Sequence, residues 1–125
     1  MIEVTAAVIQ ENGKFLICQR AKGKNCELLW EFPGGKMEAG ETPEDALCRE
    51  IREELSTEIR VDEFFCTVDY DYPAFHLTMH CYLCSLLTEA LHLNEHEAAR
   101  WLAKDELDSV QWLPADKSII EKLKN

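Results

Sequence analysis

The chain has 125 residues, a typical length for one domain, and 46% of them are hydrophobic, which is ordinary for a globular protein. Its formal net charge of −11 argues against sustained contact with a nucleic-acid polymer or an anionic membrane, because both attract basic surfaces. A small anionic substrate remains compatible with this charge if cations lie between substrate and protein. The apolar runs are far shorter than a membrane span, and the N-terminus lacks the features of a signal peptide. We therefore expect a single cytoplasmic domain over residues 1–125.

The first third of the chain predicts a β-hairpin and a short strand. Residues 2–10 form a strand-like apolar run, residues 11–13 contain an Asn-Gly turn, and residues 14–20 return as a second strand. A polar loop with a glycine occupies residues 21–29. The stretch WEFPGG at residues 30–35 predicts a short strand that ends at the proline and the glycines.

A helix is predicted from Pro43 to about Ser56. Thr42 has the side chain of a helix N-cap, and proline is favoured at the first helical position. At about 100° per residue, one apolar stripe is expected to face the core, and it consists of Leu47, Ile51 and Leu55. A second stripe at the edge of the first carries the carboxylates of Glu50, Glu53 and Glu54.

The second half of the chain predicts two long strands, a short strand and a final helix. The long strands cover residues 58–72 and 75–88, around a turn near Pro73. A polar, acidic loop follows at residues 89–99, with a short strand over 99–103 and a helical turn near 105–110. The last helix opens at Pro114 and points its apolar residues inward, namely Ile119, Ile120 and Leu123. This order predicts an α+β domain with helices packed on a sheet.

Six cysteines are spread along the chain, and without a secretory signal a disulfide framework is not expected. We interpret them as small buried hydrophobic residues, a common role of free cysteine. Cys81 and Cys84 have a CxxC spacing that also occurs in zinc sites. They fall in a predicted strand, where residues three apart face opposite sides, so their thiols should diverge.

The acidic stripe of the predicted helix admits two interpretations. A solvated acidic face is the usual one for an arbitrary helix. The alternative is a metal site, because clustered carboxylates suit a hard cation such as Mg2+, which keeps waters and is shared with substrate phosphates. Two features favour the metal. Arginines are interleaved with the glutamates, and Gly34-Gly35 precede the helix and permit a close approach of the backbone.

The helix and the loop before it resemble the signature of the Nudix hydrolases. Gly35 is followed after five residues by Glu41, and after seven more by the run Arg49-Glu50-Ile51-Arg52-Glu53-Glu54. The resemblance extends to WEFPGGK at 30–36, to Glu95-His96 before Trp101 and to LPAD at 113–116, and it is nearest to the short MutT-like branch. It implies the Nudix fold, an α/β/α sandwich. The signature differs at its end, where Ser56 and Thr57 replace a glycine and an aliphatic residue.

The resemblance implies a metal site on this helix. Glu50 and Glu54 would be the main ligands of Mg2+, which Mn2+ could replace, with help from the backbone carbonyl of Gly34. Glu53 would complete the metal or water shell. Two supporting residues would orient the glutamates and hold the preceding loop, and these are Arg49 and Glu41.

The implied reaction converts a nucleoside triphosphate to a monophosphate and pyrophosphate by in-line attack of water on phosphorus. The general base remains open between Glu53 and Glu95. Arg20 and Lys36 resemble phosphate contacts of the family, and each is equally well explained as a surface cation. The expected partner is a small nucleotide, for a protein that is a monomer or a homodimer.

The base of the nucleotide would be read by Asp116, which follows Pro-Ala in the last segment. An ionised aspartate only accepts hydrogen bonds and would pair with the exocyclic amine of cytosine. A buried, protonated one would donate and serve an oxidised guanine. Phe32 and Phe75 would line the base pocket or pack in the core. We therefore expect an enzyme that cleans the nucleotide pool, acting on 8-oxo-dGTP or on cytosine nucleotides such as CTP, dCTP or 5-methyl-dCTP.

Two other functions fit the same pattern. One is hydrolysis of a different diphosphate, such as ADP-ribose or a dinucleoside polyphosphate. The other is a non-catalytic domain that binds a nucleotide as a regulator. The second is disfavoured because such domains usually lose the glutamates of the signature, which this chain retains.

Overall fold

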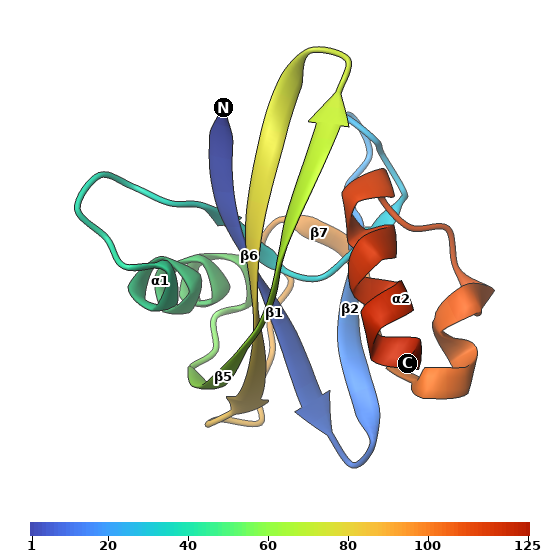
Figure 1. Ribbon diagram of the computed structural model, residues 1–125. Helices are drawn as coiled ribbons and strands as arrows, with labels where there is room; N and C mark the ends of the chain where they lie inside the picture. Colours follow the sequence, from blue (N-terminus) through green and yellow to red (C-terminus); the bar gives the residue numbers. More distant parts are fainter.

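The computed structural model describes residues 1–125 and shows a mixed β-sheet with one helix on each face (Figure 1). Its strands are β1 Ile2–Glu11, β2 Lys14–Arg20, β3 Trp30–Glu31, β4 Gly34–Lys36, β5 Ile59–Tyr72, β6 Phe75–Leu86 and β7 His96–Ala103. The helices are α1 Pro43–Leu55 and α2 Lys117–Lys124, and two 3-10 segments are η1 Lys104–Ser109 and η2 Pro114–Asp116. The α+β arrangement expected from the sequence is confirmed.

The sheet has seven strands, with the order β3-β2-β1-β6-β5, while β4 pairs with β1 and β7 pairs with β2. The β1–β6 pair is parallel, from Ile2 opposite Leu77 to Ile9 opposite Cys84, and the other ladders are antiparallel. Strand β1 is central and buried on both faces, which explains why its middle reads as a continuous apolar run rather than an alternating one.

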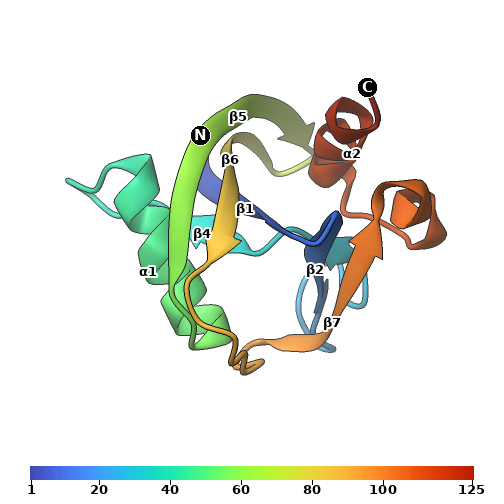
Figure 2. The ribbon, with the colours of Figure 1, turned by 90° about the horizontal axis from the view of Figure 1, so that it is seen from below.

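Two apolar clusters lie on opposite faces of this sheet. In β1, Ala6 and Val8 belong to the cluster under α2, whereas Ala7 and Ile9 belong to the cluster under α1. The predicted stripe of α1 is confirmed, because its members are fully buried in the second cluster, and they are Leu47, Ile51 and Leu55. Figure 2 shows α1 and α2 on opposite sides of the central strands.

The ends of α1 follow local chemistry. The Thr42 hydroxyl accepts a hydrogen bond from the Asp45 N–H at 3.1 Å, and Pro43 occupies the first helical position, as predicted. The helix ends at Ser56, whose φ of 51° lies in the left-handed region that favours glycine. Serine is held there by a hydrogen bond from the Asn94 side-chain amide to its hydroxyl, at 2.8 Å.

Several boundaries differ from the sequence-based expectation. WEFPGG forms two short strands separated by Phe32 and Pro33, with β3 paired to β2 and β4 paired to β1. Strand β7 begins at His96, three residues before the predicted start, where a register shift accompanies its pairing with Arg20. The first turn of the last helix is the 3-10 segment η2 rather than α-helix.

The cysteines are all free. The expected divergence of Cys81 and Cys84 is confirmed, since the first lies in the cluster under α2 and the second in the cluster under α1. The expectation of burial is wrong for Cys26, which is exposed in the loop after β2, and holds only in part for Cys48.

None of the helices combines the length and the apolar character that crossing a bilayer requires.

Candidate active site

The two glycines before α1 allow the backbone of β4 to approach both β1 and the helix. A Cβ atom at Gly34 would collide with the carbonyl of Thr5 in β1, and one at Gly35 would collide with the carboxylate of Glu50. The Gly34 N–H donates to Oε1 of Glu54 at 3.3 Å. Gly34 is therefore required for space against the backbone of β1, while Gly35 leaves room for the Glu50 carboxylate beside β4.

Arg49 joins the acidic loop to the acidic face of α1. Its guanidinium makes two hydrogen bonds to Glu41, at 2.7 and 3.0 Å, and a third to the carbonyl of Lys36 at 3.0 Å. It also donates to Glu50 at 3.0 Å and to Glu53 at 3.1 Å. The hydrogen bonds to Glu41, above all, raise the pKa of Arg49. Arg49 thus links Glu41 in the loop to Glu50 and Glu53 on α1, and the supporting roles of Arg49 and Glu41 remain a prediction.

Glu54 is the most perturbed carboxylate of the helix. Only 9% of the residue is exposed, and burial, followed by the charges of Glu31, Glu50 and Glu95, raises its pKa to about 9. Burial also raises the pKa of Glu50, against the opposing hydrogen bond from Arg49. Glu50 is paired with Arg49, but Glu54 accepts only the Gly34 N–H and has no positive charge bonded to it.

A hard divalent cation would supply that charge. The donor set fits such an ion, because carboxylate oxygens are the ligands that Mg2+ prefers and Gly34 brings a backbone carbonyl nearby. No three acidic, His or Cys side chains are arranged to surround an ion on their own. Mg2+ does not need this, because it retains waters and is usually held by one or two carboxylates together with substrate phosphates.

A small hollow next to Glu54 brings several predicted residues together. It is lined by Arg20, Ala21, Lys24, Glu31, Glu54, Glu95 and His96. The predicted phosphate contact Arg20 and the candidate base Glu95 thus lie beside the predicted metal ligand. Lys36 and Glu53 do not line this hollow: Lys36 is exposed on β4, and Glu53 faces outward with its carboxylate on Arg49.

Glu95 reaches the hollow because its loop docks on the end of α1. The amides of His92 and Asn94 donate to the carbonyls of Leu55 and Glu54, at 2.8 and 3.0 Å. These carbonyls have no partner within the helix, so the loop caps its C-terminus. The Asn94 side chain also donates to the Glu53 carbonyl at 2.9 Å. Asn94 was not singled out from the sequence, where an asparagine in a polar loop carries no specific signal.

Glu31 was also missed, although it lies within the recognised WEFPGGK stretch. Its carboxylate accepts from Arg20 at 3.3 Å and interacts with Nε2 of His96 at 2.9 Å. It also raises the pKa of Asp116, as it does that of Glu54. Glu31 therefore lies between the predicted metal end and the predicted base end of the site.

Asp116 is the last residue of η2, directly before α2, and it is buried. One of its oxygens accepts the Phe32 N–H at 2.8 Å, and burial, followed by the charge of Glu31, raises its pKa well above the usual range. The Phe32 ring is 3% exposed and stacks on Trp112 at 5.3 Å, so it packs in the core. Phe75 is 40% exposed and lies at the tip of the β5–β6 hairpin.

Comparison with known proteins identifies the family to which this chain belongs. A family model described as the NUDIX domain matches residues 4–122. The chain belongs to the Nudix family. The predicted family and fold are thereby confirmed, and the protein is a Nudix hydrolase. Enzymes of this family act on small nucleotide substrates and generally use a divalent metal such as Mg2+.

The relatives of this Nudix domain include full-length matches. It is 36% identical to the CTP pyrophosphohydrolase of Escherichia coli, over 97% of this chain and 90% of that protein. It is 33% identical to the 8-oxo-dGTP diphosphatase of Haemophilus influenzae, over 100% of this chain and 93% of that protein. The crystal structure of a MutT NUDIX hydrolase from Burkholderia pseudomallei superposes with a TM-score of 0.86 at 28% identity, covering 97% of this chain and 96% of that one.

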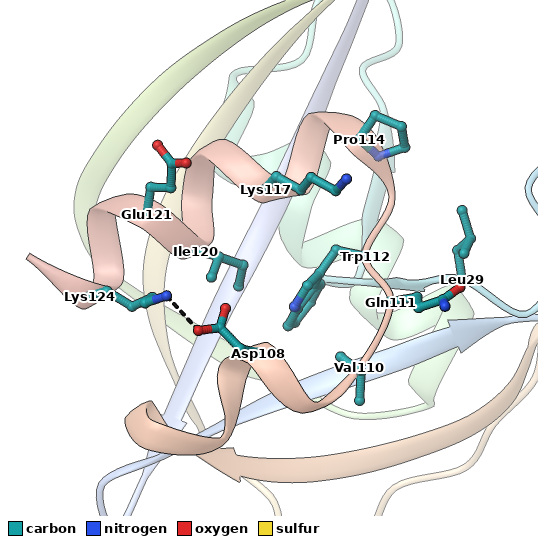
Figure 3. A pocket seen from close by; sticks show the side chains of 10 residues that line it. All are labelled: Leu29, Asp108, Val110, Gln111, Trp112, Pro114, Lys117, Ile120, Glu121 and Lys124. Carbon is teal, nitrogen blue, oxygen red and sulfur yellow. Dashed lines mark hydrogen bonds and ion pairs between the residues drawn. The ribbon is translucent and has the colours of Figure 1, made fainter.

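A second hollow, larger than the one beside Glu54, lies away from α1, between α2 and the segment after η1 (Figure 3). It has a volume of about 650 Å³ and includes Trp112, Pro114 and Lys117, with Asp108 and Lys124 paired across one end at 2.6 Å. It shares no residue with the small hollow next to Glu54, so this larger hollow and the carboxylates of α1 belong to different parts of the molecule.

Proposed function

We propose that the protein hydrolyses a nucleoside triphosphate to the monophosphate and pyrophosphate with Mg2+. The observation that carries this proposal is Glu54, a buried carboxylate on the Nudix helix surrounded by other carboxylates. A triphosphate is strongly anionic, as is the protein, whose formal net charge is −11. The two can meet at this site only if cations neutralise the approach.

Glu54, Glu50 and the Gly34 carbonyl would hold the metal, with Arg49 fixing the position of Glu50. The bound metal would neutralise charge on the phosphate oxygens and help to orient the attacking water. Arg20 would contact the phosphates, because its guanidinium lines the same hollow as Glu54. The protein's part is to place water and phosphorus in line, since phosphoryl transfer depends on positioning and charge neutralisation more than on covalent catalysis.

Glu95 is our candidate for the general base. It lines the hollow beside Glu54, where it pairs with Lys24 at 3.7 Å, whereas Glu53 does not line the hollow and its carboxylate is bonded to Arg49. Glu95 would take a proton from water as the water oxygen bonds to phosphorus and the bridging P–O bond breaks, releasing pyrophosphate. Replacing Glu95 by glutamine should lower kcat by roughly 100-fold or more, and Glu53→Gln should lower it less.

The geometry around Asp116 favours an oxidised guanine nucleotide as substrate. Burial raises the pKa of this carboxyl well above its usual range, and one oxygen is already engaged by the Phe32 N–H. In its protonated form the other oxygen would donate to a carbonyl of the base. The Haemophilus influenzae relative is an 8-oxo-dGTP diphosphatase, which supports this assignment.

A cytosine nucleotide is the second candidate. The CTP pyrophosphohydrolase of Escherichia coli is 36% identical to this chain. For such a substrate Asp116 would be ionised when the nucleotide is bound and would accept from the exocyclic amine of cytosine.

A kinetic panel separates these possibilities. Initial rates and products would be measured with Mg2+ on 8-oxo-dGTP, CTP, dCTP, 5-methyl-dCTP and ADP-ribose, in the unchanged protein and in Asp116→Asn. The asparagine amide can donate but cannot become an anion, so this variant should keep activity on 8-oxo-dGTP and lose it on cytosine nucleotides. A preference for ADP-ribose would overturn the triphosphate assignment, and identical preferences in both proteins would remove Asp116 from base recognition.

A further inference from the structure

The tip of the β5–β6 hairpin extends beyond the central sheet. The ladder between β1 and β6 begins at Ile2 opposite Leu77, so Tyr72 and Phe75, which pair with each other, lie past the end of β1. In Figure 2 the same end of β5 curves over until it reaches α2. The tip therefore depends for its position on contacts with the C-terminal part of the chain.

An aromatic cluster fills this tip. The rings of Tyr70 and Tyr72 lie 4.7 Å apart, and those of Tyr72 and Phe75 lie 5.2 Å apart and nearly stacked. Tyr72 is thus in the middle of the cluster. Its ring fixes the place of Phe75, the exposed aromatic residue that would meet the base.

One polar contact ties this cluster to the segment that carries Asp116. The hydroxyl of Tyr72 accepts a hydrogen bond from the Ala115 N–H at 3.2 Å. Ala115 is 1% exposed and directly precedes Asp116 in η2. The Asp116 carboxyl is held in turn by the Phe32 N–H at 2.8 Å. Tyr72 thus connects Phe75, which is predicted to line the base pocket, with Asp116, which is predicted to read the base.

We propose that Tyr72 is a positioning residue for base recognition, whose hydroxyl holds Asp116 in register with the ring of Phe75. This inference rests on the proposed function, in which Asp116 reads the base. The sheet and the aromatic stack explain the ring of Tyr72 but not its hydroxyl, because stacking needs no oxygen. The hydroxyl bonds to one group, the backbone N–H of Ala115 next to Asp116.

The chain offers a matched pair of variants to test this. Tyr72→Phe keeps the stacked ring and removes the oxygen, which leaves a buried N–H without a partner. Tyr70→Phe removes the same oxygen from the neighbouring ring, whose hydroxyl has no recorded hydrogen bond. Both variants should fold, since each retains its ring.

Steady-state kinetics on 8-oxo-dGTP and CTP form the first readout. Loss of one hydrogen bond to a buried amide should raise KM for the preferred triphosphate roughly tenfold in Tyr72→Phe and change kcat less than about twofold. The ratio of kcat/KM between the two bases should fall towards one. In Tyr70→Phe each quantity should stay within about twofold of the unchanged protein. A merely structural role would lower activity on both substrates alike and leave their ratio unchanged.

Amide hydrogen exchange gives a second readout that needs no activity. The amides of Ala115, Asp116 and Lys117 should exchange roughly tenfold faster in Tyr72→Phe than in Tyr70→Phe, because the turn loses the hydrogen bond from the Ala115 N–H to Tyr72. Equal exchange and equal base ratios in the two variants would overturn the role of Tyr72. If the unchanged protein cleaved no triphosphate, the proposed function would fall instead, while the exchange comparison would still decide whether Tyr72 holds the turn.

Discussion

Replacing Glu54 by glutamine should stabilise the free protein and abolish its metal-dependent activity. In the folded chain the carboxyl has a pKa of about 9, against an ordinary value of 4.5. At pH 7 folding must therefore bind a proton that the unfolded chain has released. The free energy of this step is about 1.4 kcal/mol per pH unit above 4.5, or about 3 kcal/mol at pH 7. Glutamine is neutral in both states, and its carbonyl can still accept the Gly34 N–H.

The pH dependence of this effect is its signature. A carboxyl whose pKa is raised in the folded state does not lower the unfolding free energy below its unfolded pKa of 4.5. The loss of unfolding free energy grows as pH rises from 4.5 towards 9. The gain in unfolding free energy of Glu54→Gln should thus be under about 1 kcal/mol at pH 5 and about 3 kcal/mol at pH 7. Urea unfolding followed by tryptophan fluorescence, in the presence of a chelator, would measure both values.

Glu53→Gln is the matched control on the same helix. Glu53 is 52% exposed and paired with Arg49, so its replacement should change stability by about 0.5 kcal/mol or less at either pH. Mg2+ should then stabilise the unchanged protein and have little effect on Glu54→Gln. The reasoning would be refuted if the difference in unfolding free energy between Glu54→Gln and the unchanged protein did not vary with pH. It would also be refuted if Glu54→Gln were less stable than the unchanged protein.

Three further predictions concern the residues that shape the site. Gly35→Ala should lower kcat/KM by roughly tenfold or more with little loss of stability, because the new methyl group displaces the flexible carboxylate of Glu50. Arg49→Lys should lower kcat/KM by roughly tenfold or more, since a lysine cannot bridge Glu41 and Glu50 as the guanidinium does; rates near those of the unchanged protein would remove Arg49 from this role. Ser56→Gly should be at least about 1 kcal/mol more stable than Ser56→Ala in urea unfolding, because both lack the hydroxyl and only alanine is strained at a φ of 51°.

The regular elements were predictable because their signals are local. The N-cap Thr42, the proline after it and the apolar stripe of α1 lie within one short stretch, and the helix forms where they indicate. The start of β7 was not predictable in this way. Residues 96–98 are polar or small, and they become a strand only because β2 offers them a partner across a register shift.

The candidate site was predictable in part, for a similar reason. The spacing of the signature identifies Glu50, Glu54 and Arg49. The contact between Phe32 and Asp116 joins residues 84 positions apart, and no sequence pattern marks it. Phe32 was expected at the base pocket or in the core, and its ring lies in the core while its backbone amide reaches Asp116. Tyr72 lacked any signal, because its role depends on where the curved hairpin ends.

The separation of the two apolar clusters by the sheet has a consequence for how such enzymes diversify. Residues beneath α1 support the hydrolytic carboxylates, and residues beneath α2 support the segment with Asp116, and the two clusters have no residue in common. Mutations that remodel the second side can accumulate without disturbing the first. A lineage could therefore exchange one base for another while it inherits an unchanged centre for phosphate chemistry, provided that Glu31, which lies between the two ends, is kept.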